Sequence, residues 1–458
     1  MPSTGLGRGP DGEPGRWLLW PVLIAAGLRV GLMAAAYART GTAVMTQGDT
    51  ASYVAPMLGM LHGAYASGGM PELDRTPGYP LFLLMTGMAG GHVLVCVLCQ
   101  IAVSLLSLLL VARIAGRVFG DDRAGMVAAW LYACEPLSIV SSVRVMPETL
   151  FVLLLLCVVE RLAAYLEDGK LGSVALAGVA LAAATFVRPV SYYLVWPLAL
   201  GLAVIGPSGT GRRWKAALVL VLCTLPWLAA WQWRNYAVAG YSGFSSIVEK
   251  NLYFYQTAEL RAEMEHRSLD EEQKLLGYPD EASYTARHEE QRDWPVARRL
   301  AFMRVESMAV LREHRLLYLK THLRGILVVA FSPGATEFLQ LIGTYPDTRT
   351  MPRRVVNVGL LRSGWRLVGA HPGVAVVMVV FAVPLLILYG AGVVGMRKGK
   401  LALVLLVAGV GVYFLGISGG AQAVGRYRVP VMPELCVLAA GGLTAIRRSV
   451  PEAVPQAV

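Results

Sequence analysis

The chain has 458 residues, of which 55% are hydrophobic and only 16% are charged. Soluble globular domains average about 25% charged residues, so this composition excludes an ordinary water-soluble protein and indicates a polytopic membrane protein. The net charge of +11 does not indicate nucleic-acid binding. The Lys and Arg residues lie in short loops between apolar segments, as the positive-inside rule expects, and no basic run has interleaved aromatic residues.

Apolar stretches of about 20 residues predict the membrane spans. Ten stretches qualify, namely 17–37, 92–112, 124–143, 148–166, 171–187, 190–205, 216–233, 372–395, 401–418 and 429–446. The segment 316–332 is a further candidate, which would either cross the membrane or lie along its surface, because Lys320, His322 and Arg324 interrupt it. The predicted fold class is an all-α polytopic membrane protein with about 10 or 11 transmembrane helices.

The chain divides into three predicted parts. Residues 1–233 form an N-terminal transmembrane module, residues 234–315 a polar and mostly helical loop, and residues 316–458 a C-terminal transmembrane module. The basic residues between the spans place the N-terminus and one set of loops in the cytoplasm. The opposite, outer side then carries residues 38–91, 144–148, the segment around 188, 234–315 and 419–428.

The first outer loop contains two predicted helical segments. Thr50 to His62 mixes apolar residues with Ser and Tyr, which predicts a helix in the membrane interface. Pro77 to Gly90 is apolar but too short to span, which predicts a half-helix before the next span. In the polar loop, Glu259–Arg267 and Glu281–Arg304 have the pattern of amphipathic helices.

Two acids lie on the predicted outer side. Asp49, in the stretch Gln47-Gly48-Asp49-Thr50-Ala51-Ser52-Tyr53, is a candidate general base for a hydroxyl group, and a low dielectric would raise its pKa toward a useful range. The alternative is a helix N-cap, because Asp often accepts a backbone N–H at a helix start. Glu148 follows Pro147 and either faces the same outer cavity or only complements a helix dipole.

Three arginine sites also lie on the predicted outer side, against the positive-inside bias. Arg75 precedes Thr76-Pro77-Gly78-Tyr79-Pro80, Arg188 precedes Pro189, and Arg426-Tyr427-Arg428 precedes Pro430. Guanidinium groups pair bidentately with phosphate, so these arginines are candidates to bind a phosphate group. The alternative for a lone interfacial Arg is a side chain that extends to the lipid headgroups.

Other kinds of chemistry are not indicated. The six cysteines lie in or beside apolar runs, so Cys96 and Cys99 predict neither a disulfide nor a metal or redox site despite their CxxC spacing. The sequence has no P-loop, no HExxH and no Gly-rich dinucleotide turn after a strand. We therefore predict no metal site and no cofactor.

Several short motifs, in their order along the chain, resemble those of GT-C fold glycosyltransferases. They are the acid in the first outer loop, the Arg-Thr-Pro-Gly-Tyr-Pro turn, the Pro-Glu-Thr-Leu-Phe start of a span, the Arg-Pro pair, the Trp-Arg-Asn-Tyr exit of a span and Arg-Tyr-Arg-Val-Pro. The chain is similar to the polyprenyl- or dolichyl-phosphate-sugar-dependent protein mannosyltransferase and aminoarabinose transferase families, over roughly Asp49 to Pro433. The resemblance implies a GT-C fold and a membrane enzyme, in a bacterial inner membrane, whose active site faces outward.

The resemblance also implies functions for individual residues. Asp49 corresponds to the catalytic base of the family and Arg75 to the residue that binds the donor phosphate, while an acid of related oligosaccharyltransferases corresponds to Glu148. We expect Tyr53, Tyr79, Arg188, Arg426, Tyr427 and Arg428 to complete the substrate site. The single acid at Asp49, where some members have an acidic pair, puts metal use and two-acid schemes in doubt.

The predicted activity is transfer of a hexosyl or pentosyl group from a polyprenyl-phosphate donor to a hydroxyl or phosphate of a glycan, lipid or protein. The main alternative is a lipid-linked sugar transporter or flippase without transferase activity. A transporter would place charged residues deep within spans, often in broken helices and repeated halves, whereas the predicted spans are nearly free of charge. A non-catalytic scaffold would need no outer arginines beside an acid.

Overall fold

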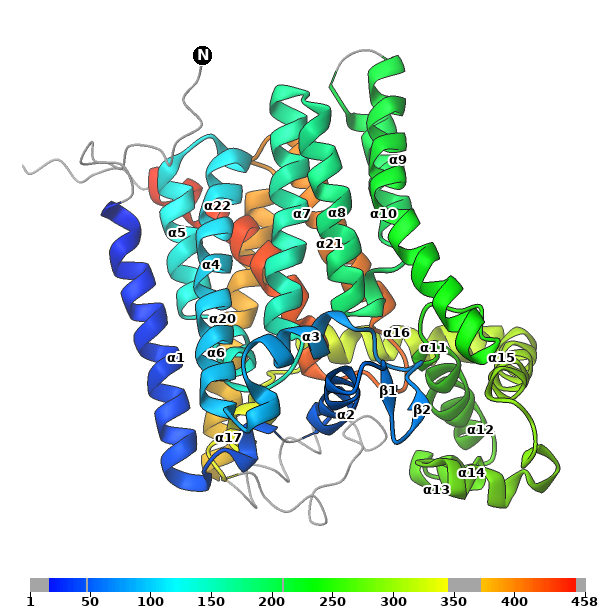
Figure 1. The fold of residues 1–458 in the computed structure, drawn as a ribbon. Coiled ribbons are helices and arrows are strands. Elements are labelled where there is room, and N and C mark those ends of the chain that lie inside the picture. Colours follow the sequence, from blue (N-terminus) through cyan, green and yellow to red (C-terminus); the bar gives the residue numbers. More distant parts are fainter. Residues whose placement is uncertain (1–15, 47, 208–209, 345–371, 450–458) are drawn as a thin grey trace, which may run out of the picture.

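The computed structural model describes residues 16–46, 48–207, 210–344 and 372–449, so Gln47 of the Asp49 motif lies outside the described residues. Within these ranges the secondary structure is helical apart from one hairpin of two-residue strands, β1 Ala66–Ser67 and β2 Met70–Pro71. Figure 1 shows long helices side by side, with the shorter elements gathered at their lower end. The all-α prediction is confirmed for this part of the chain.

Six helical segments of the described chain are long and apolar enough to cross a membrane. They are α1 (Leu19–Thr40), α4 (Val93–Phe119), α7 (Glu148–Asp168), α10 (Thr210–Ala239), α20 (Pro372–Met396), and α22 (Met432–Ser449) with the preceding 3₁₀ helix η7 (Gly425–Val431). A bent helix pair brings the number to as many as seven. The structure therefore supports fewer clear spans than the ten or eleven predicted.

The difference in number comes from short helices. Three predicted spans are α8 (Leu171–Val187), α21 (Leu401–Ile417) and α9 (Val195–Ile205), the last preceded by the 3₁₀ helix η4 (Pro189–Ser191). Each apolar segment has 17 residues, at the lower end of the length that spans a bilayer. The apolar pattern located these helices and their ends correctly, but helices of this length are at the lower limit for crossing a bilayer.

The predicted span 124–143 is not one continuous helix. α5 (Asp122–Ala133) and α6 (Pro136–Val143) meet at a bend of 55°. Pro136 has no N–H and suits the first turn of a new helix. The Glu135 carboxylate accepts two backbone N–H bonds of α6, at 3.0 and 2.5 Å, and so caps that helix. These two residues end the first helix and start the second.

The buried guanidinium of Arg29, in α1, forms hydrogen bonds with the carbonyl oxygens at the end of α5, on the other side of this bend. It donates to the carbonyl oxygens of Ala133 at 3.1 Å and Tyr132 at 3.5 Å, and to Ser104 Oγ at 2.9 Å. A buried charge needs such partners. Arg29 therefore ties α1 to α4 and to the end of α5, which gives this membrane-embedded charge a structural explanation.

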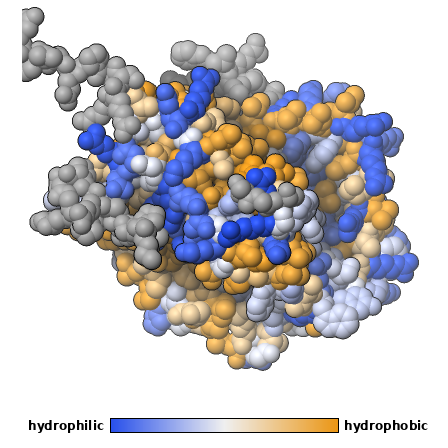
Figure 2. Space-filling model, turned by 90° about the horizontal axis from the view of Figure 1, so that it is seen from above, coloured by the Kyte–Doolittle hydropathy of each residue, from blue (hydrophilic) through white to orange (hydrophobic). Residues whose placement is uncertain are grey.

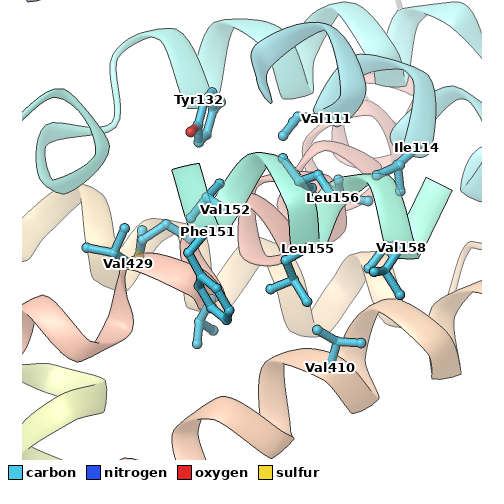
Figure 3. Close-up of a cluster of buried hydrophobic side chains, with 14 of the residues drawn as sticks. Val111, Ile114, Tyr132, Phe151, Val152, Leu155, Leu156, Val158, Val410 and Val429 are labelled. Atoms are coloured by element: carbon cyan, nitrogen blue, oxygen red, sulfur yellow. The ribbon is translucent and has the colours of Figure 1, made fainter. Parts of the chain in front are cut away.

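Helix α7 lies at the centre of the hydrophobic core. Figure 3 shows that its Leu156 points toward Val111 of α4, while Leu155 and Val158 point toward Val410 of α21. All five side chains are almost fully buried. Close packing on both sides fixes α7, because dispersion contacts rather than water exclusion hold helices together within a bilayer. The first residue of α7, Glu148, is therefore held in a fixed position.

The first outer loop folds against the lower end of the long helices (Figure 1). The predicted interfacial helix is α2 (Thr50–Leu61), and the predicted half-helix is α3 (Gly78–Met85). A Cβ atom on Gly78 would lie only 2.6 Å from the carbonyl oxygen of Phe186. Glycine at this position therefore lets α3 approach the end of α8.

The polar loop 234–315 is also largely helical. Its elements are α11 (Ile247–Asn251), a π-helix η5 (Leu252–Thr257), α12 (Ala258–Met264), α13 (Leu269–Leu275), α14 (Glu281–Arg287), η6 (Glu289–Gln291) and α15 (Val296–Glu313). The predicted helix Glu281–Arg304 is broken. Pro295 cannot donate an N–H, so a new helix starts after it.

Two further helices follow the polar loop. α16 (Arg315–Phe331) lies across the lower ends of the long helices in Figure 1, which favours the surface alternative for the predicted segment 316–332. α17 (Ala335–Leu341) comes next. Both helices therefore belong to the same end of the molecule as α2 and α3.

The basic residues that set the predicted orientation lie at the other end. Arg117 of α4 is 2.5 Å from the Glu167 carboxylate of α7, and Lys400, before α21, donates to the same carboxylate at 2.7 Å. Figure 2 views this end, where hydrophilic side chains gather among hydrophobic ones. The predicted outer segments and the basic loops thus occupy opposite ends of the bundle, and the assignment of the basic end to the cytoplasm stays a prediction.

Candidate functional site

A cavity of about 720 Å³ lies at the lower end of the molecule. Its lining includes Asp49 and Arg75 of the first outer loop, Glu148 at the start of α7, Arg188 at the end of α8 and Arg426 of η7. The polar loop supplies much of the remaining wall. The cavity thus collects residues from all the predicted outer segments, among them Asp49 and Arg426, which are 377 positions apart in sequence.

Three hydrogen bonds place Asp49 beside the start of α7. The Val145 N–H donates to the Met45 carbonyl at 2.8 Å, and the Thr50 hydroxyl donates to the Val145 carbonyl at 2.8 Å. Gln100 of α4 donates to the carbonyl of Arg144 at 2.6 Å. The segment before α7 is therefore bonded to both flanks of Asp49 and to the bundle.

Asp49 precedes α2, but its carboxylate makes no capping hydrogen bond. Oδ2 accepts a hydrogen bond from Arg426 Nη2 at 2.7 Å, and Oδ1 lies 3.8 Å from Arg75 Nη2. The side chain is 40% exposed, and the cavity is the space that it faces. The helix-cap alternative is therefore wrong, and Asp49 is held between two arginines.

The charge of Asp49 is set by these neighbours. Burial raises the pKa of the carboxyl group, but Arg426 and Arg75 together outweigh burial and leave the pKa below its ordinary value. The expectation of a raised pKa was wrong, because it considered the low dielectric without the arginines. An anion bound to the same arginines would compete for their charge and raise the pKa of Asp49 again.

Arg75 is fixed by several contacts. Its Nε donates to Ser52 Oγ at 3.0 Å and its Nη1 donates to the Tyr53 hydroxyl at 3.2 Å. The guanidinium lies 4.5 Å from the centroid of the Tyr53 ring, within the range of a cation–π interaction. Its backbone N–H donates to Glu72 Oε1 at 2.9 Å. Tyr53 thus lines the cavity and also holds the Arg75 side chain in place.

Glu148 and Arg188 form an ion pair in the cavity wall. Glu148 Oε1 lies 3.2 Å from Arg188 Nη1, and Glu148 is only 4% exposed. The Arg188 guanidinium also lies over the rings of Phe151, at 5.8 Å, and Tyr427, at 6.0 Å. The pair links α7 to the end of α8 beside Asp49.

Two residues predicted to bind substrate, Tyr79 and Arg428, do not line the cavity. Tyr79 is fully buried and donates to Gln100 Oε1 at 2.7 Å. Arg428 is 1% exposed, and its Nη1 donates to the carbonyl oxygens of Val329 and Ser332, each at 2.7 Å. These side chains join helices, and their geometry does not support a binding function.

Several polar residues near the cavity were missed by the sequence analysis. Arg144 is 8% exposed, and its Nη1 donates to Gln340 Oε1 of α17 at 3.3 Å. Burial raises the pKa of Glu337, also in α17, and Arg144 and Arg426 act in the opposite direction. Tyr255 and Gln256 of η5 also lie in the cavity wall. No local motif marks these residues, because tertiary packing alone brings them to the site.

Comparison with known proteins gives one family match and several similar folds. Residues 74–233 match the model of the dolichyl-phosphate-mannose-protein mannosyltransferase family. No curated protein matches the chain. The matched segment contains Arg75, Glu148 and Arg188, whereas Asp49 and Arg426 lie outside it.

Solved structures with similar folds include the archaeal oligosaccharyltransferase AglB of Archaeoglobus fulgidus in complex with an inhibitory peptide and a dolichol-phosphate. The TM-score is 0.51 at 13% identity, over 94% of this chain and 50% of AglB. The apo form of the Archaeoglobus fulgidus oligosaccharyltransferase gives a TM-score of 0.51 at 13% identity, over 95% of this chain and 51% of that chain. ArnT of Cupriavidus metallidurans in the apo state gives a TM-score of 0.38 at 14% identity, over 92% of this chain and 77% of ArnT.

The likeness to AglB, at this identity, concerns the fold alone. The chain spans about half the length of that oligosaccharyltransferase. The family match covers about a third of the chain, within the module that carries α4, α7 and α8. Residues 74–233 are thus similar to the dolichyl-phosphate-mannose-protein mannosyltransferase family, and the fold of the chain is similar to that of AglB.

Proposed function

We propose that this protein transfers a sugar from a polyprenyl-phosphate-linked donor to an acceptor within the cavity. The observation that carries the proposal is the Asp49 carboxylate between Arg75 and Arg426. This arrangement places a proton acceptor directly beside two groups that bind phosphate. The family match, whose description names a dolichyl-phosphate sugar, supports a lipid-phosphate donor.

The reaction follows from this arrangement. An acceptor oxygen attacks the anomeric carbon of the sugar while the bond from that carbon to the phosphate oxygen breaks. The lipid phosphate leaves with the bonding electron pair, and Arg75 and Arg426 stabilise its charge. Asp49 takes the proton of the acceptor hydroxyl. Arg188 is less available, because Glu148 already holds it, so we assign this pair to shaping the cavity wall.

The orientation and the division of the chain are part of the proposal. The cavity faces the outer side of a bacterial inner membrane, because the basic loops gather at the opposite end of the bundle. Residues 234–315 then form an outer loop between the transmembrane modules 1–233 and 316–458. The flippase alternative gains no support from Arg29, whose hydrogen bonds to α4 and α5 explain its burial.

Arg75→Ala should weaken binding of the donor by about 1.5–3 kcal/mol, the range for a hydrogen bond to a charged group. Tyr53 and Ser52 hold Arg75 in place before the donor binds, so the wild type loses little side-chain entropy on binding. Titration of polyprenyl phosphate into the purified variant measures the change. Arg298→Ala is the matched control, because Arg298 is exposed, stacks on Trp294 and does not line the cavity. Equal affinities for the two variants would contradict the assignment.

The pH dependence should distinguish the free enzyme from the donor complex. The pKa of Asp49 is lowered in the free protein, so kcat/KM should not fall from protonation of Asp49 until the pH is below about 4. The donor phosphate shares Arg75 and Arg426, so the pKa of Asp49 rises in the complex, and kcat should fall at a higher pH. Rate profiles between about pH 3.5 and 8 test this difference. Acid limbs of kcat and kcat/KM at the same pH would contradict it.

Consumption of defined donors tests the proposed function itself. Purified protein in lipid nanodiscs is supplied with polyprenyl-phosphate-linked hexoses and pentoses and with candidate acceptors. Release of polyprenyl phosphate together with a glycosylated acceptor is expected for at least one donor. Movement of an intact donor across a vesicle membrane, without release of polyprenyl phosphate, would instead favour the flippase alternative.

A further inference from the structure

The cavity continues from the charged residues into a second, neutral half. We call this part the neutral half and define it by the side chains of Tyr255, Gln256, Tyr278, Tyr318, His322 and Gln422, all of which line the cavity. They come from the π-helix η5, the segment after α13, α16 and the segment after α21. Aromatic rings and neutral hydrogen-bonding groups replace the arginines and carboxylates of the other half.

The neutral half is built by specific contacts. The Tyr255 and Tyr278 hydroxyl groups lie 3.0 Å apart, and Gln256 Nε2 donates to Gln422 Oε1 at 2.9 Å. A Cβ atom on Gly420, whose φ is +94°, would lie 2.3 Å from Gln256 Nε2, so the chain passes directly over this amide. Gln256 belongs to a π-helix, a rare conformation that is frequent at functional sites.

Two buried atoms of the neutral half lack hydrogen-bond partners among the described residues. Gln256 is 6% exposed, and its Oε1 has no donor. His322 Nε2 lies 2.9 Å from the carbonyl oxygen of Gly416, and Nδ1 has no partner. Since a carbonyl only accepts, Nε2 carries the proton and Nδ1 is an acceptor in the neutral ring. Both open positions therefore accept a hydrogen bond, and a hydroxyl group would satisfy each.

The neutral half adjoins the proposed catalytic base. Burial and the contact with Tyr278 raise the pKa of the Tyr255 phenol, and the nearby Tyr427 and Asp49 add to this effect. Tyr255 and Asp49 also line the same cavity, so the two side chains face a common space. A ligand in the neutral half can present a hydroxyl group to the Asp49 carboxylate.

The cavity also reaches water through the polar loop. Asp280 and Glu281, both exposed, line it, and Arg299 is held by Glu281 at 2.7 Å. Lys250, the other cation that the polar loop contributes to the described cavity wall, is paired with Asp74 at 2.6 Å. The exposed carboxylates repel an anionic ligand, and both cations already have a carboxylate partner. A water-borne, uncharged ligand fits this approach, whereas the lipid-linked donor arrives from the membrane.

We propose that Tyr255, Gln256, Tyr278, His322 and Gln422 form an acceptor subsite for an uncharged saccharide. This inference rests on the proposed function and deepens it by naming the acceptor class. Tyrosine rings offer flat surfaces to the apolar faces of sugar rings, and the open acceptors bind sugar hydroxyl groups. One acceptor hydroxyl loses its proton to Asp49 as its oxygen bonds to the anomeric carbon, and the donor phosphate leaves with the electrons of the broken bond.

The test compares acceptors and variants in nanodiscs with a donor that the wild type consumes. The acceptors are a labelled neutral oligosaccharide, a Ser/Thr-containing peptide and a phosphorylated glycolipid. Gln422→Ala and Tyr278→Phe should each raise KM for the oligosaccharide about three- to tenfold, as expected for a lost neutral hydrogen bond. KM for the donor should change less than about twofold.

Matched controls keep the test specific. Gln232→Ala removes an amide that bonds to Tyr192 and Ser242 away from the cavity, and Tyr236→Phe changes an exposed tyrosine. Both controls should leave KM for the oligosaccharide unchanged. Transfer only to the peptide or the glycolipid, or equal oligosaccharide KM values for subsite and control variants, would overturn the proposed acceptor subsite. In those cases donor consumption by the wild type would still support the proposed function, whereas no consumption of any donor would refute both.

Discussion

Asp49→Asn should lower kcat/KM for sugar transfer by about 10²- to 10⁴-fold, the usual contribution of a general base. The substitution removes the proton acceptor but keeps a side-chain oxygen that can accept the hydrogen bond from Arg426, which is 2.7 Å away in the wild type. Rates of polyprenyl phosphate release by wild type and variant, measured with the same donor and acceptor, give the comparison.

The same variant should still fold and bind the donor. Asp49 is 40% exposed and does not cap α2. The unfolding temperature of the variant should therefore stay close to that of the wild type. Its affinity for polyprenyl phosphate should be equal or higher, because the arginines no longer share their charge with a carboxylate. Turnover within about threefold of the wild type, far short of the loss expected for a missing base, would remove Asp49 from the catalytic position.

Arg188→Ala should lower the free energy of unfolding by about 3 kcal/mol, because it leaves the Glu148 carboxylate buried without its partner. This value is at the lower end of the usual loss of stability for a broken buried ion pair, since the Arg188 side chain is still 17% exposed. Unfolding in detergent, followed as a function of denaturant or temperature, measures the change. Arg298→Ala, on the exposed surface, serves as the control.

A double variant separates pairing from a catalytic function of Glu148. Replacing both partners, with Glu148→Gln and Arg188→Gln, should recover most of the stability lost in Arg188→Ala, because no unpaired charge is then buried. Glu148→Gln alone should affect the rate less than Asp49→Asn does, since Glu148 is already bound to Arg188. A loss of rate in Glu148→Gln as large as that in Asp49→Asn would assign Glu148 to the chemistry.

The charged half of the cavity could be predicted from the sequence, because it required only the motifs of one loop and the membrane side of each segment. Asp49 and Arg75 lie in one loop, and the basic residues between the spans placed Glu148, Arg188 and Arg426 on the same side as that loop. The structure brings these five residues to one cavity. The membrane side predicted for each segment therefore indicated which residues, far apart in sequence, lie close together in the structure.

Other features depend on tertiary contacts that no local pattern contains. Arg426 and Arg428 are two residues apart, yet only Arg426 reaches the cavity, because η7 is a 3₁₀ helix with about three residues per turn. The pKa of Asp49 could not be predicted without knowing that two arginines surround it. Gln256 and Gln422 meet only because the chain folds back over Gly420. The bend at Pro136, in contrast, was signalled by Glu135-Pro136, which the apolar pattern outweighed.

A structure of the protein with bound polyprenyl phosphate tests the central claim most directly. We expect the phosphate to lie in the 720 Å³ cavity, within hydrogen-bond distance of Arg75 and Arg426, with Asp49 beside it. The Asp49 carboxylate should then have lost part of its contact with Arg426. A phosphate bound outside this cavity, or one that touches neither Arg75 nor Arg426, would contradict the proposed site.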